Sequence, residues 1–360
     1  MIRCALLFLL SPLTSLASTP PPTVDDIVAA HLRALGGLDH IHSLHSFVLH
    51  GHYHEGNING STYVAQMRPF YRVIGSPVEP LRHQHEGYDG SAWEYYPDPG
   101  LVVRTIGAAA AATRHTSLFD DALVDYHDHG TTLEAGGATH LGANLVYILH
   151  TTLADGFRED IYVDAATWLI DGYARTVPFH AFGSNYATHM EMGDYRSEDG
   201  FLFPHSSREI DTATGHVLDE STLDSAEINP PLAPSAFSPP EWDRTLVQQM
   251  AQRLYDERTD TVAILSTYRD FRALIGTSAS TADAVDFAGY QCLKMGDVET
   301  SVALLRQNVA DNPQSPRAHF GLGRALQTAG KTADANAEFD RTLTLDPTFV
   351  KARTARDAQK

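Results

Sequence analysis

Hydrophobic residues in the first two thirds of this chain recur at every second position in short runs, a period typical of β-strands. Asn59-Gly60, Asp199-Gly200 and similar pairs separate the runs and favour tight hairpin turns. The predicted strands are 45–55, 61–74, 81–88, 92–96, 101–106, 130–135, 144–153, 157–163, 168–177, 185–196, 201–210 and 215–228. This succession predicts an antiparallel meander that closes fully or in part.

Two segments of the same region have the helical period instead. Thr23 can cap a helix at residues 23–35, which Gly36 and Gly37 would end. Residues 108–124 are rich in alanine, and we expect them to form a helix inside the sheet region. The positions expected to face the interior are Phe47, Leu49, Tyr63, Ile148 and Ile161.

Beyond Trp242 the helical period continues to the end of the chain. Residues 242–281 predict a helical hairpin, and residues 282–315 and 316–349 are two consecutive units of equal length. Equivalent positions pair as Val285 with His319, Ala288 with Leu322, Gly289 with Gly323, Cys292 with Leu326, Ser301 with Ala335, Leu305 with Phe339, Asn308 with Thr342 and Pro313 with Pro347. Small residues let two helices approach closely, so we expect Gly289 to face Ser301 and Gly323 to face Ala335.

This 34-residue period resembles the tetratricopeptide repeat (TPR), a helix-turn-helix unit that binds mainly other proteins. The resemblance implies a protein or peptide partner and a concave surface lined by the first helices of the units. Asn308 and Thr342 depart from the pattern, because the repeat usually has alanine there. Residues 242–281 would be a degenerate repeat or cap, and residues 350–360 a capping helix. The partner-binding positions implied are Asp286, Tyr290, Lys294, Phe320, Arg324 and Gln327.

The first residues have the pattern of a secretory signal peptide. Arg3 precedes an apolar run, and small residues end at Ala17, so we expect a leader at residues 1–17 and a periplasmic or secreted protein. The apolar run is too short for a membrane anchor. Loss of the leader removes Cys4 and leaves Cys292, for which a buried position in a repeat predicts a core thiol.

Charge divides the chain into two parts. Residues 1–240 hold 11 Arg, no Lys and 29 Asp plus Glu, a net charge of −18, whereas residues 241–360 hold 15 basic and 16 acidic residues, a net charge of −1. A strongly acidic protein lacks the basic face that nucleic-acid binding needs. Five prolines fall at residues 230–241, where we expect a linker between a β domain at 18–229 and the helical units.

The β region also resembles a known family. Tyr88-Asp89-Gly90, Ile161-Tyr162-Val163-Asp164, Asp194-Tyr195-Arg196 and Ala236-Phe237-Ser238-Pro239-Pro240 resemble motifs of the LolA/LolB-like periplasmic lipoprotein carriers. The resemblance implies an antiparallel, unclosed β-barrel around a helical plug, here residues 108–124, with an apolar interior that receives acyl chains. The fold class expected for the whole chain is therefore two-domain α+β: this LolA-like barrel followed by an all-α, TPR-type repeat domain.

Histidines form the most unusual chemical pattern of the β region, which holds 18 of the 19. His50, His52 and His54 alternate along one predicted strand, so they point to one face and are candidate metal ligands. Against this, residues alternating on a straight strand spread over about 13 Å, too far to share one ion. The alternatives are a polar outer face or a charge response to acid.

Enzyme signatures are weak. The chain has no Gly-x-Ser-x-Gly elbow and no phosphate-binding glycine loop, and His54-Glu55 lacks the second histidine of a metalloprotease helix. We expect no cofactor and an exported, non-enzymatic binding protein with an apolar or lipid-like ligand and a protein partner. The alternatives are an assembly scaffold of the cell envelope with an empty β domain, a histidine-rich metal-binding protein, and a hydrolase.

Overall fold

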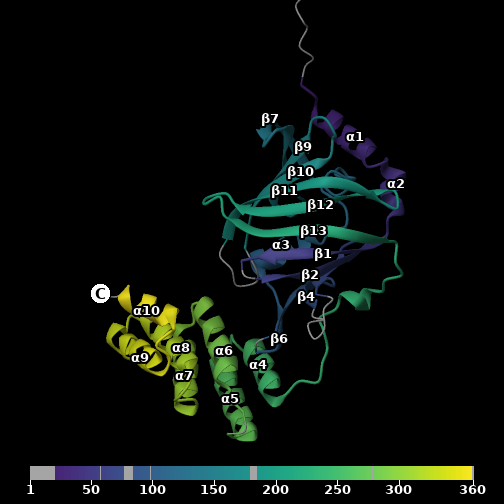
Figure 1. Ribbon diagram of the computed structural model, residues 1–360. Helices are drawn as coiled ribbons and strands as arrows, with labels where there is room; N and C mark the ends of the chain where they lie inside the picture. Colours follow the sequence, from purple (N-terminus) through teal and green to yellow (C-terminus); the bar gives the residue numbers. More distant parts are fainter. Residues whose placement is uncertain are drawn as a thin grey trace, which may run out of the picture.

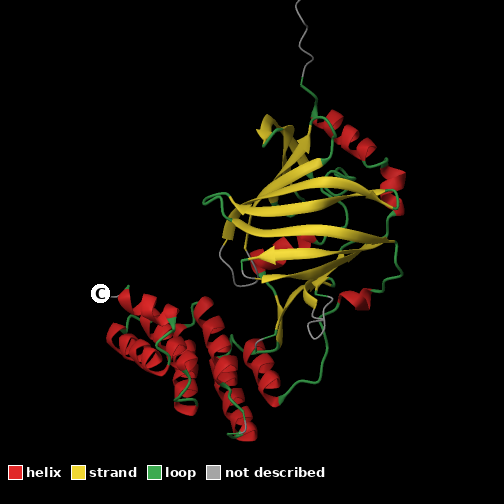
Figure 2. Cartoon of the chain, in the orientation of Figure 1, coloured by secondary structure: helices red, strands yellow, loops and turns green. Residues whose placement is uncertain are grey.

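The computed structural model describes residues 21–56, 58–76, 84–97, 99–178, 185–277 and 279–358. The predicted leader at residues 1–17 lies outside this range. A large β-sheet is followed by a succession of helices (Figures 1 and 2). None of the described helices is both long and apolar enough to cross a membrane.

The sheet has thirteen strands in the described residues and does not close on itself. Its order is β6-β5-β4-β3-β2-β1-β13-β12-β11-β10-β9-β8-β7, so β6 and β7 form the two edges. Every pair is antiparallel, which confirms the antiparallel arrangement that the alternating pattern predicts, and the open edges agree with the unclosed barrel that the family resemblance implies. The strands are β1 (Ser46–Glu55), β2 (Ile58–Met67), β3 (Tyr71–Gly75), β4 (Gln84–Tyr88), β5 (Ala92–Tyr96), β6 (Leu101–Arg104), β7 (Thr132–Leu141), β8 (Asn144–Thr152), β9 (Arg158–Asp164), β10 (Ile170–Pro178), β11 (Asn185–Glu198), β12 (Phe201–Asp211) and β13 (Val217–Ile228).

Some predicted boundaries are wrong. The predicted strand 61–74 is two strands, β2 and β3, because Pro69 lies between them and cannot donate to the ladder. Asp199 and Gly200, by contrast, have φ values of 47° and 95° at the predicted turn between β11 and β12. Two successive residues with positive φ are typical of a type I′ hairpin, which explains the Asp-Gly sequence there.

Two faces of the sheet can be distinguished by its register. We call the face that carries Phe47, Leu49 and Ile161 the inner face. Residues directly paired across antiparallel strands share a face, so Tyr63, paired with His50, lies on the opposite, outer face. Ile148, next to Leu149, which pairs with Ile161, is also on the outer face. The prediction that these two side chains face inward is therefore wrong.

Helix α3 (Gly107–Thr116) lies against the inner face. It contacts β4 and β5 near one edge of the sheet and β10 near the other, so the sheet curls around it (Figure 2). This confirms a helix inside the sheet, but the helix is shorter than the predicted 108–124, since turns follow Thr116. Leu123, within these turns, is fully buried.

The first helices cover the inner face near β8 and β9. Helix α1 (Val24–Ala34) begins at Thr23, whose side chain forms a capping box with Asp26. Ile27 and Val28 on this helix pack with Leu149 and Ile161 in one buried cluster. A short helix, α2 (Leu38–Ser43), follows the predicted stop at Gly36 and Gly37; the sequence pattern did not predict it.

The outer face is partly covered by the proline-rich segment that was predicted to be a linker. A 3₁₀ helix, η1 (Pro234–Phe237), places Phe237 in a buried cluster with Trp93, Ala65 and Val73. The Trp93 indole Nε1 donates to the Phe237 carbonyl at 2.9 Å. This part of residues 230–241 is therefore packed against the sheet, unlike a free linker.

Three helical hairpins and a final helix complete the described chain. The helices are α4 (Leu246–Asp256), α5 (Thr261–Ile275), α6 (Ala282–Lys294), α7 (Val298–Asp311), α8 (Pro316–Thr328), α9 (Thr332–Leu345) and α10 (Val350–Asp357). Asn308 and Thr342 are fully buried and occupy equivalent positions of two hairpins. The Asn308 amide donates to the Ala282 carbonyl, and the Thr342 hydroxyl donates to the Pro316 carbonyl, again at equivalent positions. These polar residues therefore join the two helices of each hairpin.

The sheet and the helices share one hydrophobic core at β6. Leu101 and Val103 are fully buried in a cluster with Met250 and Leu254 of α4. The Gln252 side chain also hydrogen bonds both the backbone N–H and the backbone carbonyl of Val102, each at 2.9 Å. The amide of α4 thus occupies the hydrogen-bonding position of a further strand and covers this sheet edge.

Candidate functional site

The predicted partner-binding residues lie on α6 and α8, and five of the six gather there. The Arg324 guanidinium carbon lies 4.5 Å from the centre of the Tyr290 ring and 5.7 Å from that of Phe320. The Lys294 ammonium lies 5.6 Å from the same Tyr290 ring. Cations within about 6 Å of an aromatic face are attracted to it. We call Asp286, Tyr290, Lys294, Phe320 and Arg324 the α6–α8 face; Gln327 is exposed near the end of α8.

Asp286 is the acidic member of the α6–α8 face. Arg317 approaches it, with its Nε 3.3 Å from the carboxylate. Burial raises the pKa of Asp286 to about 6, although Arg317 and Arg324 oppose the rise. Gly321 lies against this carboxylate, and a Cβ at that position would be 1.9 Å from Oδ1. Only glycine therefore leaves room for Asp286, a requirement that the repeat pattern did not reveal.

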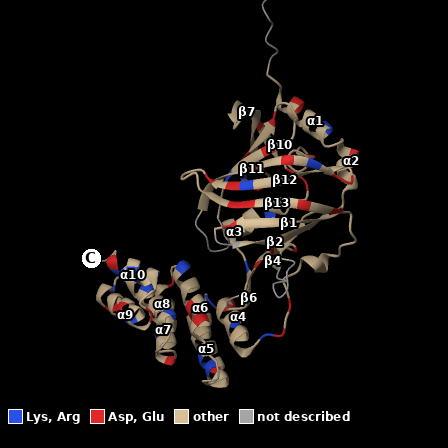
Figure 3. Cartoon of the chain, viewed as in Figure 1, with Lys and Arg blue, Asp and Glu red and all other residues tan. Residues whose placement is uncertain are grey.

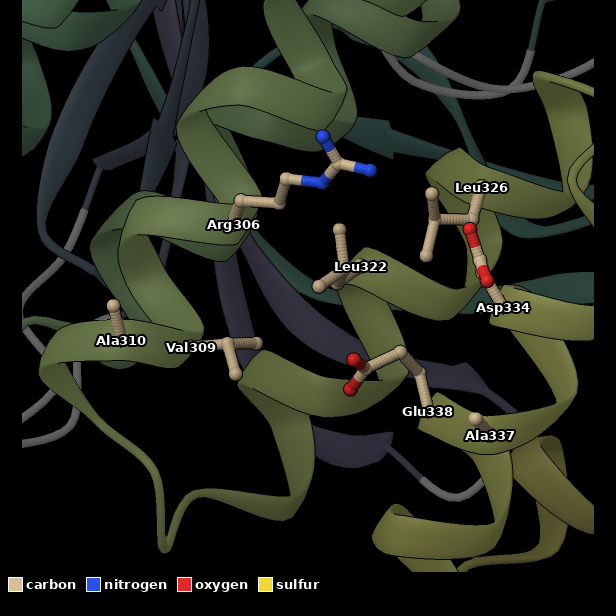
Figure 4. A pocket seen from close by; sticks show the side chains of 8 residues that line it. All are labelled: Arg306, Val309, Ala310, Leu322, Leu326, Asp334, Ala337 and Glu338. Carbon is tan, nitrogen blue, oxygen red and sulfur yellow. The ribbon is translucent and has the colours of Figure 1, made fainter.

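A separate hollow of about 370 Å³ opens between α7, α8 and α9 (Figure 4). Leu322 and Leu326 form its apolar floor, and Arg306 extends toward it from α7. Glu338 lines it from α9 and accepts a hydrogen bond from His319 at 2.6 Å. The hollow contains none of the predicted partner-binding residues.

The three histidines proposed as metal ligands lie on β1 and belong to the outer face. His50 lies 2.8 Å from Glu227 and His52 lies 3.2 Å from Asp224, both on β13. His54 is exposed two residues further along the strand. Among the described residues, no group of three or more His, Cys, Asp or Glu side chains is arranged to hold a metal ion. The geometry thus pairs His50 and His52 with acidic neighbours.

The inner face carries a group of polar side chains that the sequence reasoning missed. Glu209 on β12 pairs directly with Asp219 on β13. Arg175 on β10 pairs directly with Glu159 on β9 and with Thr188 on β11. The register places all five on the inner face. With Glu55 on β1, we call Glu55, Glu159, Arg175, Thr188, Glu209 and Asp219 the inner-face polar cluster.

Electrostatics within the inner-face polar cluster are unbalanced. One guanidinium, Arg175, lies 3.6 Å from Glu209, and its charge also acts on Glu159 and Asp219. Burial raises the pKa of Asp219 to about 7, and the carboxylates of Glu209 and Glu55 raise it further than burial alone would. Burial also raises the pKa of Glu159, against the effect of Arg175. Glu159, Glu209 and Asp219 therefore share the charge of a single guanidinium, that of Arg175.

Helix α3 adds little positive charge to this region. Arg114 forms an ion pair with Asp155. Burial, together with the charges of Arg114 and Arg175, lowers the pKa of His115 to about 4, so its imidazole is neutral at pH 7. Arg72 is paired with Glu86 at 3.2 Å. Arg72 and Arg114 are thus already paired with carboxylates outside the cluster.

Apolar side chains lie beside the cluster on the same face. Leu49, Val64 and Ile74 are direct partners across β1, β2 and β3, and each is only half-buried. The apolar interior that the family resemblance implies is therefore interrupted by polar groups on the central strands. Deep burial of apolar residues is found instead near β8 and β9, where α1 covers Leu149 and Ile161.

A signal for the polar cluster was present in the sequence. Charged residues recur at alternate positions, as at Glu209 and Asp211, within a strand that also carries apolar residues. A single sequence does not say which of two alternating faces points inward, because the period of two is the same for both. The pairing register settles this assignment.

Cys292 is free and fully buried in the core shared by the helices and β6. Burial raises the pKa of its thiol to about 11. A protonated, buried thiol is a poor nucleophile. This confirms the predicted core position.

No family model matches this chain, and no curated protein matches its sequence. Among solved structures, it is similar to a LolA superfamily protein from Nitrosomonas europaea, with 10% identity, a TM-score of 0.40, and coverage of 61% of this chain and 98% of the other. A DUF1329 family protein from Desulfovibrio piger has 15% identity, a TM-score of 0.39, and coverage of 60% and 97%. A putative outer membrane lipoprotein-sorting protein domain from Vibrio parahaemolyticus has 10% identity, a TM-score of 0.38, and coverage of 59% and 94%. At these values the likenesses transfer no residue and no activity to this chain.

Proposed function

We propose that this chain is an exported, non-enzymatic binding protein whose sheet holds a lipid-like ligand on its inner face. The observation that carries the proposal is the unclosed sheet curled around α3, with half-buried Leu49, Val64 and Ile74 beside polar groups. Alanine side chains on α3 take up little volume. An amphiphile could place its apolar chain along Leu49, Val64 and Ile74 and its polar end against the inner-face polar cluster.

The test is extraction of the purified protein with organic solvent, followed by mass spectrometry. We expect an amphiphilic molecule in stoichiometric amount. Val64→Glu places a charge beside Leu49 on the inner face and should abolish retention of the amphiphile. The matched control is Thr222→Glu on β13, which changes a residue paired with His52 on the outer face and should leave retention unchanged. A wild-type preparation free of ligand would favour the scaffold with an empty β domain.

For the helical part, we propose that the hairpins are TPR-type repeats and that the α6–α8 face docks a protein segment. Support comes from Arg324, which is only half-buried and lies near two aromatic rings, with Lys294 and Asp286 adding charges of both signs. Aromatic residues and arginine contribute most of the energy at many protein interfaces. A partly acidic, partly basic peptide with an apolar anchor would match this combination.

A photo-crosslinking residue tests this docking. Placed at Gln327, which is exposed beside the α6–α8 face, it should crosslink to one protein of the cell envelope. The same residue at exposed Thr344 on α9 is the control and should not. Tyr290→Ala should abolish the crosslink from Gln327 without unfolding the protein. Equal crosslinking from both positions would contradict the proposal.

A further inference from the structure

The inner-face polar cluster contains buried groups whose hydrogen-bonding capacity is not used. Thr188 is 1% exposed, and its hydroxyl has no partner among the described residues. Glu209 is 7% exposed, and its Oε1 has no partner there either. Buried polar atoms in native proteins are nearly always hydrogen bonded, so such atoms call for an explanation. The buried Nε of Arg175 also lacks a partner there, so the cluster has one unused donor and two unused acceptors; a bound ligand that donates hydrogen bonds would satisfy the two acceptors.

The missing partner should be positive. Glu159, Glu209 and Asp219 all share the charge of Arg175, whereas Arg72 and Arg114 pair with Glu86 and Asp155. Buried carboxylates without a counter-charge are costly, because the protein interior solvates charge poorly. The pKa of Asp219, raised to about 7, records the same excess of negative charge. A bound cation would relieve it.

The geometry distinguishes an organic cation from a metal ion. Metal sites need several ligands at short distance around one point, and the described residues contain no such group of His, Cys, Asp and Glu. An ammonium group instead has three donors that point in different directions. Carboxylates on β12 and β13 and a hydroxyl on β11 can accept those donors without forming a compact shell.

We propose that the inner-face polar cluster binds a primary amine that carries an apolar chain. The ammonium group lies between Glu209, Asp219 and Thr188, and the chain runs toward Leu49 and Val64, half-buried on the same face. This rests on the proposed function and names the chemical class of its ligand. The tyrosine hydroxyl of Tyr53, which donates to Glu55 at 2.5 Å, keeps that carboxylate in place beside the site.

Isothermal titration calorimetry of the purified, solvent-stripped protein at pH 8 tests the charge preference. The probes are octylamine, octanoate and octanol, which share one chain length, and spermidine, which has amines without the chain. We expect octylamine to bind at least tenfold more tightly than octanoate and octanol, as the loss of a charge-assisted hydrogen bond implies. Equal affinity for octylamine and octanoate would overturn the amine proposal.

Two isosteric substitutions locate the ammonium group. Glu209→Gln should weaken octylamine binding at least tenfold, and Thr188→Val, which removes no charge, should weaken it about fivefold. Glu227→Gln is the control, because Glu227 pairs with His50 on the outer face and should leave the affinity unchanged. Thermal melts of all three variants check that the fold is retained. Should Glu209→Gln and Thr188→Val both bind like the wild type, the site is elsewhere and the proposal fails.

The outcomes separate this inference from the proposed function. If the extracted lipid has no amine and the protein binds octanol more tightly than octylamine, the amine proposal fails, and the proposed lipid-binding function stands. If spermidine binds as tightly as octylamine, the cluster binds amines, but the proposal of a lipid-like ligand fails. Calcium or zinc chloride that displaces octylamine and itself binds in a Glu209-dependent manner would assign the cluster to a metal and overturn the inference.

Discussion

Asp219 is a carboxyl group whose ionisation opposes folding. Its pKa is about 7 in the folded chain, above the ordinary value, because it is partly buried beside Glu209 and Glu55. The unfolded chain loses this proton first as pH rises, so the folded state becomes less stable between about pH 4 and pH 7. Asp219→Asn cannot ionise. In ligand-free protein we expect the free energy of unfolding of the variant, relative to that of wild type, to increase by about 1–2 kcal/mol from pH 5 to pH 8, after allowance for solvent screening.

Urea unfolding at the two pH values measures this difference. The difference between Asp219→Asn and wild type should be smaller at pH 5 than at pH 8. The same difference at both pH values would show that the Asp219 carboxyl titrates normally.

His31 makes the opposite kind of contribution, since its charged form stabilises the fold. Its ring nitrogens lie 2.8 Å from the Trp168 carbonyl and 3.2 Å from the Asp121 carboxylate, an arrangement that needs two N–H donors. Burial lowers the pKa of His31, but the charge and hydrogen bonds of its partners outweigh burial and raise it overall. The stabilisation is complete below about pH 6.5 and is lost as pH rises through the raised pKa.

We therefore expect His31→Gln to cost about 3 kcal/mol at pH 6, because it leaves Asp121 without its buried partner, and less at pH 9. The free energy of unfolding at both pH values measures this. His129→Gln, at an exposed position, should change stability by less than about 0.5 kcal/mol. A loss that does not depend on pH would mean that His31 is neutral in the fold.

Close approach between the two helices of a hairpin depends on glycine. A Cβ at Gly323 in α8 would lie 2.5 Å from the Phe339 ring in α9, and one at Gly289 in α6 would lie 2.5 Å from Leu305 in α7. Glycine to alanine in a helix ordinarily stabilises by up to about 1 kcal/mol. Here we expect Gly323→Ala to destabilise by about 1–3 kcal/mol, because the ring has to move.

Thermal unfolding of Gly323→Ala tests this, with Thr328→Ala as the control at an exposed position of the same helix. The control should stay within about 0.5 kcal/mol of wild type. An alanine at residue 323 that raises the melting temperature would show that α8 and α9 do not approach closely there.

These elements also show how far the sequence alone leads. The spacing of small residues predicted that Gly289 lies against the second helix, and Ser301 does donate a hydrogen bond to the Gly289 carbonyl at 2.8 Å. Local patterns found the strands, hairpins and α3 for the same reason: neighbouring residues specify them. The inner-face polar cluster was not found, because Arg175, Glu209 and Asp219 meet only through the register of strands far apart in the sequence. Gly321 was missed likewise, since its neighbour Asp286 belongs to another hairpin.

At the scale of the whole molecule, acidic and basic residues are seen on both the strands and the helices (Figure 3), although residues 1–240 carry nearly all of the net charge. The two regions nevertheless meet through an apolar contact. Leu101 and Val103 of the edge strand β6 share their buried cluster with Leu254 and Met250, and Gln252 completes the backbone hydrogen bonds of Val102. Removal of the helices would expose both an apolar patch and a strand edge.

This shared core predicts that the sheet and the helices unfold together. Leu254 is fully buried, so Leu254→Ala should cost about 2–5 kcal/mol. Because Leu254 contacts side chains of both regions, the fluorescence and the helical circular dichroism signal at about 222 nm should shift to the same lower midpoint. The fluorescence is measured in a Trp242→Phe background, where it reports on Trp93 and Trp168 of the sheet region and no longer on Trp242 beside α4. Val262→Ala, at a residue 78% exposed on α5, should move neither signal. If the helical signal alone shifts to a lower midpoint while the fluorescence keeps its wild-type midpoint, the two regions unfold independently. A ligand on the inner face could not then influence docking at the α6–α8 face through this core.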